Sequence, residues 1–151
     1  MNLNSGDIFL IPLSDGTFSI GQVIALEKRS LICVSCCLFD IRVQNKSLPD
    51  GIILDQNRCF STLLVFRDYL LKKKWEIVGN QKLRIKRKYY PYEKELKSGG
   101  IGIKILEEEL VQLFVNAFFG LEYWNGYRDP EYFDRLLLDK TKKPTGLIYK
   151  K

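Results

Sequence analysis

The first two dozen residues of the chain predict a β-hairpin. Asp15-Gly16 lies between two apolar runs, and Asp-Gly is the dipeptide that tolerates positive φ at both central positions of a tight turn. Gly21 falls inside the second run, where a glycine is typical of a bulge or a sharp bend. We therefore expect residues 7–13 and 17–26 to pair antiparallel and to begin a small, bent sheet.

Further strands are predicted wherever apolar residues form short runs or alternate with polar ones. These runs are at residues 31–41, 52–54, 61–66, 75–79 and 147–149. Residues 83–89 alternate in their first half. If this segment is a strand, Arg84, Lys86 and Lys88 share one of its faces.

Two helices are predicted in the last third of the chain. Apolar residues recur at helical spacing from Leu106 to Leu121, and Asp129 with Pro130 is typical of a helix start. Strands followed by helices indicate an α+β fold, mainly β, with a bent antiparallel sheet or SH3-like partial barrel before the two helices. We expect one domain over residues 1–151, with a β-rich part at 6–92, a helical part at 104–138 and a basic tail at 140–151.

The residues that most often carry catalysis are missing or wrongly spaced. The chain has no histidine, which removes the commonest general base and metal ligand and every Ser–His or Cys–His pair. The acids Glu107–Glu109 are typical of a helix start, and the glycines at 99–102 lack the order of a phosphate-binding loop. We therefore predict no enzymatic activity and no cofactor.

Four cysteines raise the question of a metal or redox site, and the sequence argues against both. Cys33, Cys36 and Cys37 lie in one run of strand formers, and Cys59 stands apart. On a strand, Cys33 and Cys36 point to opposite faces and do not chelate one ion together. We expect reduced, metal-free core thiols in a cytoplasmic protein, since no apolar run reaches the roughly 20 residues of a membrane span and no signal peptide is apparent.

The net charge of +6 suits an anionic partner, although such a surface is often only a solvated face, and the basic excess is concentrated between Lys72 and Lys97. Within it, the Lys82–Lys97 strip places tyrosines beside cations, as in single-stranded nucleic-acid platforms. A second aromatic-rich segment lies between the two predicted helices, and such clusters are enriched at protein interfaces. The candidate partner-binding residues are Arg87, Tyr89, Tyr90, Tyr92, Trp124 and Tyr127.

Three short motifs carry a family resemblance. They are Gly6-Asp7-Ile8-Phe9-x-Ile11-Pro12-Leu13-x-Asp15-Gly16, then Gly21-Gln22-Val23, and further on Trp75-x-x-x-Gly79. Together they resemble the immunity protein 26 family of bacterial polymorphic toxin systems. The resemblance implies a mostly β fold and a non-enzymatic role, which is to bind and neutralise a cognate toxin encoded beside the gene.

The same resemblance gives no catalytic residues to carry over, and its motif residues look architectural. Inhibitors of nucleases are often acidic, whereas this chain is basic, so the toxin's chemistry stays open. The alternative function is a small basic nucleic-acid-binding β-barrel that uses the Lys82–Lys97 strip. The sequence does not decide the oligomeric state.

Overall fold

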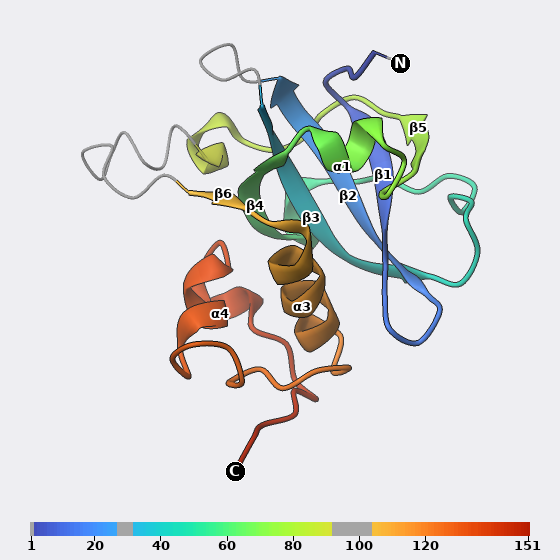
Figure 1. Cartoon of the computed structure of the whole chain (residues 1–151). Coiled ribbons are helices and arrows are strands. Elements are labelled where there is room, and N and C mark those ends of the chain that lie inside the picture. Colours follow the sequence, from blue (N-terminus) through green and yellow to red (C-terminus); the bar gives the residue numbers. More distant parts are fainter. Residues whose placement is uncertain (1, 27–31, 92–103) are drawn as a thin grey trace.

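The computed structural model describes residues 2–26, 32–91 and 104–151, and its centre is an open six-stranded sheet (Figure 1). The strand order is β5-β1-β2-β3-β4-β6, antiparallel throughout except for the parallel β4–β6 pair. The strands are β1 (Asp7–Pro12), β2 (Phe18–Leu26), β3 (Cys33–Val43), β4 (Cys59–Phe66), β5 (Ile77–Asn80) and β6 (Ile105–Leu106). The predicted α+β, mainly β class is confirmed.

The opening hairpin is confirmed, but only one of the two residues of Asp15-Gly16 has the positive φ that this dipeptide tolerates. The Leu13 amide donates to the Thr17 carbonyl at 2.8 Å, which leaves a three-residue loop between them. Gly16 has a φ of +87°, whereas Asp15 is not among the residues with positive φ. Instead, the Asp15 carboxylate accepts from the Thr17 amide at 3.0 Å and its hydroxyl at 2.6 Å. A glycine in the left-handed region after such a turn is typical of three-residue hairpin loops.

Gly21 allows an aromatic ring to cross the second strand. A Cβ at this position would lie 2.4 Å from Cζ of Phe9, whose ring packs over the glycine. The Phe9 ring is itself stacked on Trp75, with centroids 5.7 Å apart and planes 7° apart. The register of β2 against β3 shifts between Ser19 and Gly21, so the predicted irregularity is confirmed.

Alternation along the strands divides the core between the two faces of the sheet. One face is covered by α1 (Asp68–Leu71), α3 (Glu108–Phe118) and α4 (Tyr132–Leu136), and Phe9, Val23 and Cys36 are buried beneath them (Figure 1). The other face buries Ile8, Ile20 and Cys37. Its cover comes from connecting segments that contribute Leu48, Leu54, Leu83, Ile85, Tyr89 and Tyr90.

Several predicted elements are shorter than expected or absent. Residues 52–54 form no strand, and the segment 83–89 contributes one bridge, between Arg84 and Asp55, followed by the 3-10 helix η2 (Arg87–Tyr89). Leu83 and Ile85 do turn inward, but they pack across the face of the sheet instead of joining its edge. Because Leu83 and Ile85 are turned inward and their polar neighbours outward, the segment alternates as a strand would.

The C-terminal elements also differ in their bounds. Leu106 belongs to β6, so α3 begins two residues later. The carboxylate of Asp129 accepts from the Glu131 amide at 3.0 Å and so stabilises the turn before α4, whose first residue is Tyr132. The predicted strand at 147–149 is reduced to a bridge between Ile148 and Tyr123.

All four cysteines are buried free thiols. Cys36 faces the helices, Cys37 faces the opposite side of the sheet, and burial raises the pKa of both thiols. In the ranges that the structure describes, no group of three His, Cys, Asp or Glu side chains is placed to hold a metal ion. None of the helices described is both long and apolar enough to cross a membrane.

Candidate functional site

The predicted partner-binding residues fall on two separate parts of the molecule. Arg87, Tyr89 and Tyr90 lie on and beside η2, which precedes the grey trace leading to β6 (Figure 1). Trp124 and Tyr127 lie in the connection from α3 to α4, at the other end of the molecule in this view. Tyr92, together with the rest of the strip up to residue 97, falls outside the described residues.

The two tyrosines of the η2 region are half-buried. Both pack against the core on the side of the sheet away from the helices. The Tyr89 carbonyl accepts a hydrogen bond from the Thr62 hydroxyl at 2.6 Å, and the Lys88 ammonium lies 5.0 Å from the centroid of the Tyr89 ring. The packing of these tyrosines and the hydrogen bond from Thr62 therefore hold η2 against the sheet. The cationic side chains of Lys86, Arg87 and Lys88 are exposed.

Trp124, one of the candidate partner-binding residues, is buried, with only 1% of its surface accessible. Its indole packs against Phe114 and Phe133, and its Nε1 donates to the carboxylate of Asp134 at 2.9 Å. Tyr127 is half-buried and stacks on Phe133, with centroids 6.0 Å apart. The exposed large side chains of this end are Tyr123, Ile148 and Tyr149.

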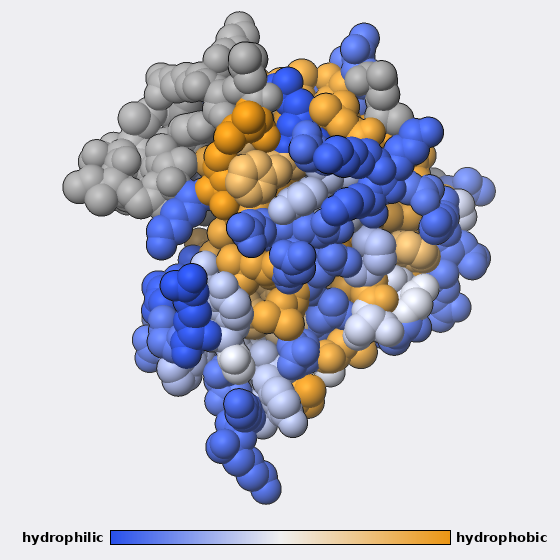
Figure 2. Space-filling model, in the orientation of Figure 1, coloured by the Kyte–Doolittle hydropathy of each residue, from blue (hydrophilic) through white to orange (hydrophobic). Residues whose placement is uncertain are grey.

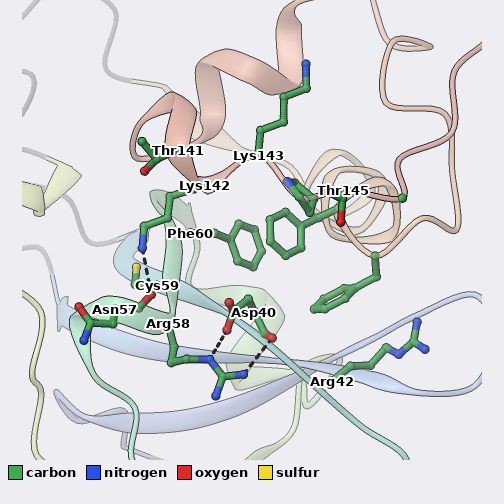
Figure 3. A pocket seen from close by; sticks show the side chains of 14 residues that line it. Asp40, Arg42, Asn57, Arg58, Cys59, Phe60, Thr141, Lys142, Lys143 and Thr145 are labelled. Carbon is green, nitrogen blue, oxygen red and sulfur yellow. Dashed lines mark hydrogen bonds and ion pairs between the residues drawn. The ribbon is translucent and has the colours of Figure 1, made fainter.

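A cleft of about 680 Å³ lies between the sheet and the C-terminal segment (Figure 3). One wall comes from the end of β3 and from η1 (Gln56–Arg58) with the start of β4. The other comes from the end of α3 and from η3 (Lys140–Lys142) with the residues after it. We call this hollow the basic cleft, and its lining residues are Asp40, Arg42, residues 57–60, Phe118, Phe119 and residues 141–146.

Two cations point into the basic cleft and are held there by hydrogen bonds (Figure 3). Arg58 donates from Nε to the Asp40 carboxylate at 2.5 Å and from Nη2 to the Asp40 carbonyl at 3.3 Å. Lys142 donates from Nζ to the Asn57 carbonyl at 2.9 Å. The hydrogen bond from Lys142 to Asn57 connects the two walls of the cleft, and the two residues are 85 positions apart in the sequence.

Two further cations complete the lining. The guanidinium of Arg42 lies 5.7 Å from the centroid of the Phe119 ring and 3.7 Å from the Asp15 carboxylate. Lys143 points its ammonium away from the cleft (Figure 3), to a 3.0 Å ion pair with Asp134. Because Asp40 is the one carboxylate among the lining residues, the basic cleft has a positive net charge.

Local contacts fix the positions of the walls. The Asp139 carboxylate accepts from the amide of Thr141 at 2.8 Å and from its hydroxyl, and this capping of η3 lowers the pKa of Asp139. Below the cleft, Phe60 stacks on Phe118 with centroids 3.7 Å apart and meets Phe119 edge-on. The cations therefore stand on a packed aromatic floor that resists rearrangement.

The chemistry of the basic cleft favours binding over catalysis. Its one carboxylate is already paired with Arg58, and the Cys59 thiol beside it is buried. Guanidinium and ammonium groups on a rigid floor bind anions through charge-assisted hydrogen bonds. The basic tail is visible in the sequence, but no local motif connects it with Arg42 or Arg58, because these residues lie far from it in the chain.

Hydrophilic and hydrophobic side chains occupy different parts of the face drawn in Figure 2. Hydrophilic side chains lie over α1 and the C-terminal segment, and hydrophobic side chains reach the surface between them along α3.

Comparison with family models places the chain among the immunity proteins. The matching family is Immunity protein 26, over residues 4–102, and the chain belongs to this family. The resemblance found in the opening motifs is thus confirmed. No curated protein and no solved structure matched the chain. The matched range holds β1 to β5 and one wall of the basic cleft, whereas α3, α4 and the other wall lie beyond it.

Proposed function

We propose that this protein is a non-catalytic immunity protein that binds and neutralises one cognate bacterial toxin of a polymorphic toxin system. Membership of the Immunity protein 26 family carries the proposal, because immunity proteins have a toxin as partner. Neutralisation of this kind requires a fitted surface with a few strongly binding side chains, and not a reaction.

The placement of charged groups supports a binding role. The chain has no histidine, and Asp40, Asp129 and Asp134 each pair with a cation in the part of the chain described. The hydrogen bond from Arg135 lowers the pKa of Asp129, and, although partial burial opposes it, hydrogen bonds from Trp124 and Lys143 lower the pKa of Asp134. The surface therefore offers fixed charges to a partner.

Nucleic-acid binding is the alternative function, and the structure gives it less support than the sequence did. Base stacking requires open aromatic faces. Tyr89 and Tyr90 are packed against the core, so the η2 region presents cations without a stacking platform among the described residues. The net charge of +6 is the feature that keeps this alternative open to test.

Co-expression with the toxin encoded beside the gene tests the proposed function. We expect full rescue of growth in a bacterial host that expresses this toxin, and no rescue of a host that expresses an unrelated toxin. Failure of rescue, together with oligonucleotide binding that weakens steeply with salt, would replace the proposal with the nucleic-acid alternative.

A further inference from the structure

We propose that the basic cleft is the docking site for an acidic segment of the partner toxin, with aspartate or glutamate side chains held between Arg58 and Lys142. This inference rests on the proposed function and adds the surface and the chemistry of recognition. The residues that carry it differ from the candidates that the sequence indicated.

Arg58 has donors left for a partner. Its side chain is 51% exposed, and the pairing with Asp40 occupies Nε and one hydrogen of Nη2. A guanidinium carries five N–H donors in a planar fork, so its outer edge matches an incoming carboxylate. The contact with Asp40 fixes the orientation of that edge before the partner arrives, which reduces the entropy lost on binding.

Lys142 supplies charge that its hydrogen bond does not neutralise. Its ammonium donates to the carbonyl of Asn57, which is a neutral acceptor, and an ammonium has two more protons to donate. Arg42 lines the cleft over the Phe119 ring and is 3.7 Å from the Asp15 carboxylate. A partner carboxylate in the cleft thus meets cations from three separate elements, and an adjacent apolar side chain would rest on the half-buried Phe119.

The cleft suits an acidic protein segment better than a nucleic acid. At about 680 Å³, its volume is within the range of sites that enclose a ligand of a few side chains. The ion pairs Arg58–Asp40 and Lys143–Asp134 interrupt the positive charge, so the cleft offers no continuous row of free cations to a row of phosphates. Discrete carboxylates on a folded partner can be placed between these ion pairs.

A pair of charge-reversal variants tests the docking site. The cleft variant is Arg58→Glu/Lys142→Glu, and the matched control is Lys72→Glu/Lys73→Glu, which makes the same change of net charge at exposed positions after α1, outside the cleft and the Lys82–Lys97 strip. Affinity for the neighbouring toxin is measured by calorimetry at about 150 mM salt, where long-range attraction is largely screened. Circular dichroism and thermal melting show whether each variant folds, and Arg58→Ala/Lys142→Ala replaces the cleft variant if the reversal unfolds it.

We expect the cleft variant to bind the toxin at least about 30-fold more weakly and the control to stay within about threefold of wild type. Tight binding by a folded cleft variant would overturn the docking site and leave the proposed function standing. Equal losses in both variants would also overturn it, because they would show attraction by net charge alone.

A peptide-binding experiment tests the docking site separately from the proposed function. If the wild-type protein does not bind the toxin, the proposed function fails, and the cleft is tested with a fluorescent hexaglutamate peptide. Peptide binding by wild type that the cleft variant loses supports an acidic-segment site. Absence of peptide binding, or an oligonucleotide that binds through Arg58 and Lys142 instead, contradicts it.

Discussion

Replacing Gly21 with alanine tests the packing on which the opening motif depends. The added Cβ would lie 2.4 Å from the Phe9 ring, about 1 Å closer than the 3.4 Å at which ordinary contact begins. The ring has little room to retreat, because it is fully buried and stacked on the buried Trp75. Either the ring or strand β2 must therefore move.

The expected cost is about 3 kcal/mol, the upper part of the range for overpacked cores. In a protein of this size, that loss corresponds to a fall in melting temperature of roughly 6–12 °C. Urea unfolding followed by circular dichroism measures it directly. The Gly79→Ala variant is the matched control, since its Cβ would meet only side-chain ends, the Cδ1 atoms of Leu48 at 3.1 Å and of Ile8 at 4.0 Å. A terminal methyl group rotates away easily, so we expect a change within about 0.5 kcal/mol.

A double variant identifies the cause. If the ring is the obstacle, Phe9→Leu/Gly21→Ala will be more stable than the sum of its single changes predicts, by at least about 1 kcal/mol. The reasoning is refuted if Gly21→Ala unfolds at the wild-type urea concentration, or if the two changes add without coupling.

Three more predictions concern the helical end and the thiols. Although partial burial opposes ionisation, hydrogen bonds from Trp124 and Lys143 lower the pKa of Asp134 below its usual value of 3.8. Wild type should therefore be more stable than Asp134→Asn near neutral pH, where the carboxylate is charged. In urea titrations this difference in the free energy of unfolding should shrink as the pH falls below about 4, because the carboxylate is then protonated. Trp124→Phe loses the hydrogen bond to Asp134, so the free energy of unfolding should fall by about 1 kcal/mol. Because the indole is buried, toxin affinity measured by calorimetry should not change. A large loss of affinity in the folded variant would contradict this prediction. Burial raises the pKa of Cys36 and Cys37, so these two thiols should resist, in the native protein, a reagent that labels them in denaturant; rapid labelling of either one in the native protein would show otherwise.

The features that the sequence predicts well are those set by neighbours in the chain. Asp15-Gly16 and the flanking apolar runs specify the hairpin locally, and the apolar stripe after Leu106 specifies α3. The turn type was missed because the Asp15 carboxylate bonds to Thr17 and makes positive φ unnecessary at Asp15. The alternation in residues 83–89 is compatible with a strand but does not decide one, because burial across a sheet face gives the same pattern as pairing at its edge.

The candidate site was less predictable because it depends on distant parts of the chain. Trp124 and the exposed tyrosines look alike in sequence, and only the packing of Phe114 and Phe133 decides that the tryptophan is buried. The basic cleft exists because the segment around Lys142 folds back to Asn57. Nothing near either residue in the sequence indicates this contact.

Titration of the purified protein into its purified neighbouring toxin tests the central claim most directly. If the protein is an immunity protein that acts by binding, calorimetry will show a saturable complex with a dissociation constant in the nanomolar range, about −12 kcal/mol. The toxin's activity will fall in proportion to the complex formed. No complex at micromolar concentrations, or a complex in which the toxin stays fully active, would contradict the account.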